Sequence, residues 1–169
     1  MDIAFLAGSA HLGILVFLAF YIFIIRNKHW GDWVYIYYSF AVLLSWTILN
    51  GECAVTYALK CLQKNKCIAG KEVYEENDLY ILPVSVFWQK RIVDLLFVFW
   101  WYSLYRVFDR NRISSSISIT FIGAWAFYRI LLELNTDYYK NKTFQFWQAL
   151  VFILTAVLLL RVVTARMPK

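Results

Sequence analysis

The sequence predicts an all-α protein, a polytopic transmembrane bundle of five helices. Each of five apolar stretches is close to the ~20 residues that an α-helix needs to cross a hydrocarbon core about 30 Å thick. Composition agrees, because 62% of the 169 residues are hydrophobic and only 17% are charged, whereas soluble domains carry about 25% charged residues. The stretches are Ile3–Ile25, Trp33–Leu59, Val84–Tyr105, Ser115–Leu134 and Phe144–Val163.

The connections between these stretches are short, so we expect one integral membrane domain over residues 1–169. The first stretch lacks a preceding basic segment and is too long for the apolar core of a signal peptide, so it should remain as a helix. Pro83 suits the first turn of the third helix. Asp109–Arg112 predicts a polar turn, and Ser114–Ser116 supplies hydroxyls that can cap the fourth helix.

Aromatic residues make up 20% of the chain, and many lie at the ends of the stretches. Trp and Tyr favour the membrane–water interface, because their rings are apolar and their N–H or O–H groups reach water. Boundary positions of this kind are Trp30, Trp33, Trp88 and Trp147. Four tryptophans lie deeper, where an anchoring role does not explain them: Trp46, Trp100, Trp101 and Trp125.

Six polar residues inside the stretches should collect at one membrane level. Successive helices alternate in direction, so late positions in even-numbered helices and early positions in odd-numbered helices share a side. Charged groups inside a bilayer are costly, so we expect them to face inward and to pair. The candidate binding residues are His11, Glu52, Asp94, Arg129, Glu133 and Gln148. The opposite half of the bundle is almost entirely aliphatic and aromatic.

This polar cluster has three interpretations. As packing glue, it would give Arg129 a carboxylate partner, with Glu133, Glu52 and Asp94 expected in that order. As a binding site for a headgroup, small molecule or proton, it would surround a pocket of at least ~300 Å³. Catalysis would need a base such as His11 oriented by Glu52, and nothing in the sequence brings these two together. We assign no catalytic residue, no cofactor and no metal ligand.

The connecting segments carry further candidates. Cys61 and Cys67 could form a disulfide in an oxidising compartment or remain two unpaired thiols, and two thiols do not complete the four ligands that zinc needs. Asn141 begins a glycosylation sequon, Asn-Lys-Thr. Lys and Arg divide eight against eight between the two sides, so the positive-inside rule is tied. The cysteines and the sequon favour an outside N-terminus and a cytoplasmic C-terminus.

The most distinctive local run lies near the end of the second stretch. A Cys-x-x-Thr step at Cys53 and Thr56, with His11 in the first stretch, resembles a family of small uncharacterised multi-pass membrane proteins with a Cys-Pro-Leu-Thr signature. Ala54 stands where that signature has Pro.

The same run is also similar to small membrane proteins of large DNA viruses that infect protists and algae. The residues that carry this second resemblance are Asn50–Cys53, Thr56, Tyr57 and Lys60. Both resemblances lie within His11–Lys60. Neither group implies an activity, and the viral one implies a virion or host-derived membrane as the location.

The function that we expect is a non-enzymatic membrane protein with a structural or binding role. Its partners would be membrane lipids and other membrane subunits. The net charge of +6 does not indicate nucleic acid, because Lys and Arg lie mainly between the apolar stretches. One alternative is a small transporter or proton-conducting protein. Another is a lipid-modifying membrane enzyme, which would have to work with only two histidines, His11 and His29, on opposite sides of the membrane.

Overall fold

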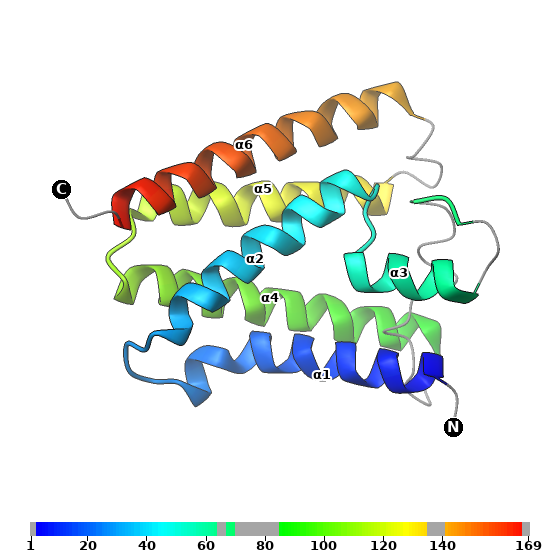
Figure 1. Ribbon diagram of the computed structural model, residues 1–169, viewed down its shortest axis with the longest axis horizontal. Helices are drawn as coiled ribbons and strands as arrows, with labels where there is room; N and C mark the ends of the chain where they lie inside the picture. Colours follow the sequence, from blue (N-terminus) through cyan, green and yellow to red (C-terminus); the bar gives the residue numbers. More distant parts are fainter. Residues whose placement is uncertain (1–2, 64–66, 70–84, 135–140, 167–169) are drawn as a thin grey trace.

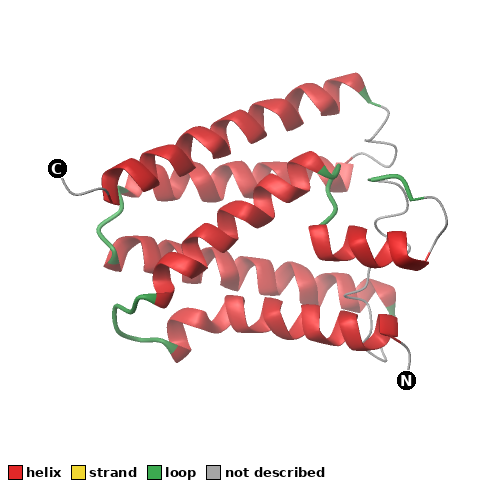
Figure 2. Cartoon of the chain, viewed as in Figure 1, coloured by secondary structure: helices red, strands yellow, loops and turns green. Residues whose placement is uncertain are grey.

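The computed structural model describes residues 3–63, 67–69, 85–134 and 141–166. This part of the chain forms helices joined by turns and contains no strand (Figure 2). Its six helices are α1 (Ile3–Ile24), α2 (Gly31–Ile48), α3 (Ala54–Gln63), α4 (Val86–Arg110), α5 (Ser115–Leu134) and α6 (Lys142–Arg166). Pro83, which we expected at the start of the third helix, lies outside the described residues.

The five long helices run alternately back and forth along the molecule, and the short helix α3 lies at one end (Figure 1). Helix α1 packs along α4, α2 packs against α6, and α5 contacts both α4 and α6. The chain enters α1 at the end where α3 lies and leaves α6 at the opposite end. This alternation places the late part of α2 and α5 beside the early part of α1, α4 and α6.

Two of the described helices are long and apolar enough to cross a membrane. They cover Ser115–Leu134 and Lys142–Ala165, and a shorter apolar run covers Gly8–Ile24. Helix α4 is long enough, but its ends carry charged residues, among them Arg91 and Arg110. Length and composition therefore give two candidate spans in the part of the chain that the structure describes.

An aromatic cluster forms the centre of the core. The indole of Trp125 is fully buried, and its ring centroid lies between 4.7 and 6.3 Å from those of Trp46, Phe97, Trp100 and Phe121. Most of these contacts are edge-to-face, an arrangement that aromatic rings favour. Three of the four deep tryptophans of the sequence are thus buried core residues, and the fourth, Trp101, is half-buried.

The helix ends differ from the predicted stretches in informative ways. Helix α5 has the predicted bounds, Ser115–Leu134. Helix α4 continues past the predicted end at Tyr105 as far as Arg110. The extra turn forms because its last residues are buried on one side: Val107 and Phe108 are fully buried.

We expected the second apolar stretch to form one helix. In the structure it is divided between α2 and α3. Helix α2 ends at Ile48, and Asn50 and Gly51 adopt φ angles of 50° and 91°. The N–H of Gly51 donates to the carbonyl of Trp46 at 2.7 Å, the bond that defines a Schellman C-cap. Asn and Gly are the residues that best tolerate this left-handed backbone. Asn50, Gly51 and Glu52 interrupt the apolar pattern, which resumes after them, and α3 begins at Ala54.

Candidate binding site

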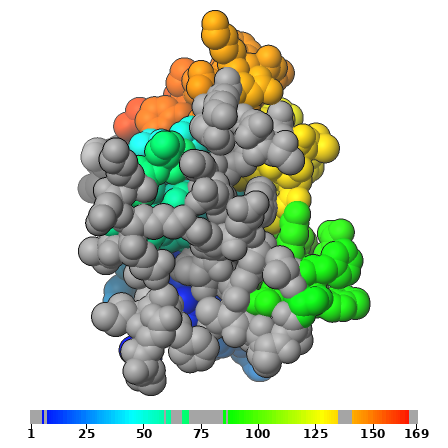
Figure 3. Space-filling view, turned by 90° about the vertical axis from the view of Figure 1, so that its right-hand side faces the viewer, coloured from blue at the N-terminus to red at the C-terminus, as the bar shows by residue number. Residues whose placement is uncertain are grey.

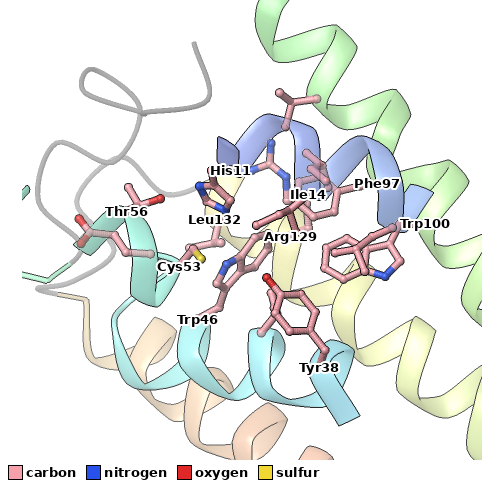
Figure 4. Close-up of a pocket in the computed structure, with 16 residues that line it drawn as sticks. His11, Ile14, Tyr38, Trp46, Cys53, Thr56, Phe97, Trp100, Arg129 and Leu132 are labelled. Carbon is pink, nitrogen blue, oxygen red and sulfur yellow. The ribbon is translucent and has the colours of Figure 1, made fainter. Parts of the chain in front are cut away.

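A pocket lies at the end of the bundle where α3 packs, and residues from α1 to α5 enclose it (Figure 4). Its cavity volume is about 70 Å³, which is below the ~300 Å³ that we expected of a small-molecule site. Seen from this end, α3 lies on one side of the molecule and α4 and α5 lie on the other (Figure 3). The pocket is therefore framed by the ends of several helices.

Aromatic rings form one continuous wall of the pocket. The rings of Trp46 and Phe97 lie 5.3 Å apart, those of Phe97 and Trp100 lie 5.8 Å apart, and those of Tyr38 and Trp100 lie 6.4 Å apart. All four residues line the pocket. A mostly apolar wall with a few converging polar groups is the usual form of a small-molecule site.

Three buried polar atoms of lining residues have no hydrogen-bond partner among the described residues: Trp46 Nε1, Glu52 Oε2 and Arg129 Nε. The side chain of Glu52 is almost fully buried, and its Oε1 accepts a hydrogen bond from Lys60 Nζ at 2.5 Å. Its other oxygen, Oε2, accepts none, and the indole Nε1 of Trp46 donates none. Buried polar atoms are nearly always satisfied in folded proteins, and Trp46 Nε1 and Glu52 Oε2 are exceptions in this lining.

The remaining polar lining comes from helices that the sequence could not place side by side. Figure 4 shows His11, Trp46 and Cys53 directed toward the same space. His11 and Glu52 both line the pocket, as a catalytic pair would require. The hydrogen bond of Glu52 goes to Lys60, so the structure does not show the carboxylate orienting the histidine.

Arg129 has two carboxylate partners. Its guanidinium lies 2.8 Å from Glu133 Oε1 on the same helix and 2.7 Å from Asp94 Oδ1 on α4. We expected Glu133 first, Glu52 second and Asp94 third, so the expected order is wrong for the last two. Glu52 does not pair with Arg129, because the chain turns at Gly51 and places Glu52 beside Lys60 on α3.

The segment after α3 is tied to the pocket region. A disulfide joins Cys61 to Cys67, with their Cα atoms 5.2 Å apart, so the structure has the first of the two states left open by the sequence. Lys60 Nζ also donates to the carbonyl of Ile68 at 3.2 Å. Asn50 Nδ2 donates to the carbonyl of Ala69 at 3.1 Å. The residues beside the second cysteine thus hold both α3 and the end of α2.

Two of the predicted residues serve helix ends outside the pocket. Gln148 on α6 donates to the carbonyl of Thr47 and, at 3.0 Å, to Asn50 Oδ1, so it secures the end of α2. Asn141 is exposed, and its Oδ1 accepts the backbone N–H of Thr143 at 2.9 Å, which is the bond of a helix N-cap. Glycosylation at Asn141 stays a prediction.

Sequence reasoning missed a second buried polar cluster, at the opposite end of the bundle. Asp32 in the first turn of α2 is fully buried. It accepts hydrogen bonds from Tyr21 Oη at 3.0 Å, Arg110 Nε at 2.8 Å and Asn111 Nδ2 at 2.7 Å. A second nitrogen of Arg110 also contacts this carboxylate, and a third donates to the carbonyl of Ile25 at 2.5 Å. The cluster joins α1, α2 and α4.

The environment of Asp32 stabilises its charged form. Burial opposes that charge, but the hydrogen bonds from Arg110, Asn111 and Tyr21 outweigh it, so the pKa of Asp32 is lower than usual. Asp32 precedes the apolar stretch that begins at Trp33, and Arg110 lies in the segment where the sequence predicts a polar turn. The available signal was an acid and a base in two connections on the same side of the bundle.

The described residues contain no group of three His, Cys, Asp or Glu side chains that could hold a metal ion. Comparison with known proteins assigns no family, because no protein-family model, no curated protein and no solved structure matches this chain.

Proposed function

We propose that the protein is a multi-pass membrane protein that binds a small molecule in the pocket beside α3, without an enzymatic role. The observation that carries the proposal is the pair of unsatisfied atoms, Trp46 Nε1 and Glu52 Oε2, in one pocket lining. If the cluster only fixed the packing of the helices, each such atom would lower the stability by about 1–3 kcal/mol with nothing to offset that loss. A bound molecule that hydrogen-bonds to both removes that cost.

The proposed membrane arrangement uses α1, α2, α4, α5 and α6 as five spans. Two of them are candidate spans by length and composition. Support for the others comes from large apolar side chains that each long helix leaves exposed: Ile24, Val34, Leu95, Ile130 and Leu160. Soluble monomers rarely expose large apolar patches, whereas in a bilayer exposed apolar side chains contact hydrocarbon.

The proposed orientation puts the pocket end and the N-terminus outside and the C-terminus in the cytoplasm. The Cys61–Cys67 disulfide supports this side as the oxidising one. The resemblance over His11–Lys60 extends the proposal to a virion or host-derived membrane, with lipids and other membrane subunits as partners. Tags at the two termini should be accessible from opposite sides of sealed membranes. Accessibility of both from one side would overturn an odd number of spans.

Binding is tested by filling the pocket. Val42 is buried in the lining, whereas Val55 is exposed and outside it. Native mass spectrometry of protein reconstituted in lipid nanodiscs should show a bound small molecule on the wild type and on Val55→Phe. The Val42→Phe variant should lose that molecule while keeping the wild-type helical circular dichroism. A wild type without any bound molecule, or equal retention by both variants, would contradict the proposal.

A second candidate function, proton conduction, is favoured by hydroxyl groups between the two polar clusters. Ser39 Oγ accepts from Trp100 Nε1 at 3.2 Å and lies 2.9 Å from the carbonyl of Tyr35, to which it donates. Tyr35 Oη donates to the carbonyl of Leu18 at 2.9 Å. A pH-sensitive dye inside proteoliposomes tests it. Proton entry above that of empty liposomes, lost in Ser39→Ala, would favour conduction over binding.

A further inference from the structure

We infer that the pocket takes an uncharged amphiphile bearing a hydroxyl group. The hydroxyl lies between Trp46 and Glu52, and the apolar body lies along the wall formed by Tyr38, Phe97 and Trp100. This inference rests on the proposed binding function and adds the chemical class of the ligand.

Two of the three unsatisfied atoms in the lining, Trp46 Nε1 and Glu52 Oε2, have complementary requirements. An indole N–H can only donate a hydrogen bond, and a carboxylate oxygen can only accept one. A hydroxyl group does both, so a single one can accept from Trp46 Nε1 and donate to Glu52 Oε2. A ligand carboxylate would satisfy Trp46 but repel Glu52, and an ammonium group would satisfy Glu52 but leave the indole N–H without an acceptor.

The charges around the pocket exclude a charged ligand. Among the described residues, every acid there already has a base within ion-pair distance. The pairs are Glu52 with Lys60, Asp94 with Arg129 and Arg91, and Glu133 with Arg129 and Lys90. A charged ligand would therefore enter apolar surroundings without a counter-charge of its own, which is strongly unfavourable.

The opening of the pocket indicates an amphiphile that enters from lipid. Ile14 lines the pocket and yet is 44% exposed, so the pocket reaches the outer surface of α1. The neighbouring outward residues on that helix, Val16 and Phe17, are also exposed and apolar. In the proposed membrane arrangement this surface contacts hydrocarbon, and a molecule with an alkyl or ring body can pass from the bilayer into the pocket.

Cys53 provides a reporter for the test. It lines the pocket and is the free cysteine of the chain. In nanodiscs without reductant, we would measure the rate at which methyl methanethiosulfonate modifies Cys53 in the presence of decanol, decanoate or decylammonium. Decanol should slow modification about tenfold at a concentration where the charged probes change it less than about twofold.

The matched variants are Trp46→Phe and Trp101→Phe. Trp46→Phe removes the N–H and keeps an aromatic ring, so decanol protection should weaken about tenfold, which is the upper end for one lost hydrogen bond. Trp101 Nε1 is likewise buried with no described partner, but Trp101 does not line the pocket. In the Trp101→Phe variant, decanol should therefore protect Cys53 as well as it does in the wild type.

The outcomes separate this inference from the proposed function. Equal or better protection by a charged probe, or full decanol protection of Trp46→Phe, would overturn the ligand class and leave binding intact. Failure of all three probes would do the same if native mass spectrometry finds a bound molecule. Failure of all three probes on a wild type that carries no molecule would overturn both.

Discussion

Lys60 on α3 and Glu52 in the turn before it form an ion pair in which both side chains are almost completely withdrawn from solvent, at 8% and 0% exposure. The pair fixes the first turns of α3 against the end of α2 and so closes one side of the pocket. A buried charge that loses its partner is far more costly than one at the surface. The pair therefore stabilises the turn at Gly51 that lies between α2 and α3.

Replacing Lys60 by Met should destabilise the protein by about 3–5 kcal/mol, because it leaves the Glu52 carboxylate buried without a cation. The double variant Lys60→Met with Glu52→Leu should recover most of that loss. Unfolding by sodium dodecyl sulfate in mixed micelles provides the measurement. Lys90→Met is the control, because Lys90 and Glu133 are each 31% exposed and such a pair contributes about 1 kcal/mol or less. A double variant as unstable as the single one would contradict the role of the pair.

Gly51→Ala should destabilise the protein by about 1–3 kcal/mol, from a left-handed backbone and a steric clash. Gly51 has a φ of 91°, and an added Cβ would lie 2.5 Å from Leu132 Cδ2. Gly13→Ala is the matched control, because an added Cβ there meets nothing within 4 Å and alanine favours a helix by about 1 kcal/mol. Thermal unfolding in detergent should rank Gly51→Ala below the wild type and Gly13→Ala at or above it. Equal unfolding midpoints for Gly51→Ala and Gly13→Ala would mean that the left-handed turn at Gly51 does not contribute to stability.

The sequence predicted the part of the fold that depends on periodicity and direction. The bounds of α5 follow from its apolar run, and alternating helix directions correctly placed Asp94 beside Arg129. The break at Asn50 and Gly51 was missed although Asn-Gly is a turn signal, because apolar residues continue on both sides and a single glycine inside a span is compatible with a helix. Tertiary context decided the turn, which offers Gly51 a place against α5 that no larger residue could take.

The contact between Asp32 and Arg110 lies beyond what spacing in the sequence can predict. The two residues are 78 positions apart, Asp32 at the start of α2 and Arg110 at the end of α4. Positive-inside counting treats every arginine in a connection as exposed to headgroups, and it therefore cannot identify one that folds inward. The pairing becomes visible only when α1 and α4 are packed side by side, as they are in Figure 1.

Asp32 should make the stability depend on pH under acidic conditions. Because its pKa is lower in the folded protein than the usual value of about 3.9, its stabilising contribution is complete above that usual value. The contribution is lost as the pH falls through the folded pKa. The stability difference between wild type and Asp32→Asn should therefore be constant above about pH 5 and shrink below about pH 4.

Thermal unfolding between pH 2 and pH 7 measures this dependence. Asp109→Asn is the control, because Asp109 is exposed in the last turn of the same helix that carries Arg110. The stability of Asp109→Asn should follow that of the wild type across this pH range. A constant difference between Asp32→Asn and the wild type down to pH 2 would show that the charge of Asp32 does not stabilise the fold.

Loss of the Cys61–Cys67 disulfide should loosen α3 and open the pocket. Ile68 and Ala69, which follow the second cysteine, accept hydrogen bonds from Lys60 and Asn50, so freeing this segment weakens two anchors at once. Replacing both cysteines by Ser should lower stability by about 2 kcal/mol, as expected for a short disulfide loop, and should speed modification of Cys53. Alkylation of the denatured wild type should label one thiol before reduction and three afterwards, since the chain has three cysteines. Three labelled thiols before reduction, or an unchanged Cys53 rate in the double Ser variant, would contradict this role of the bridge.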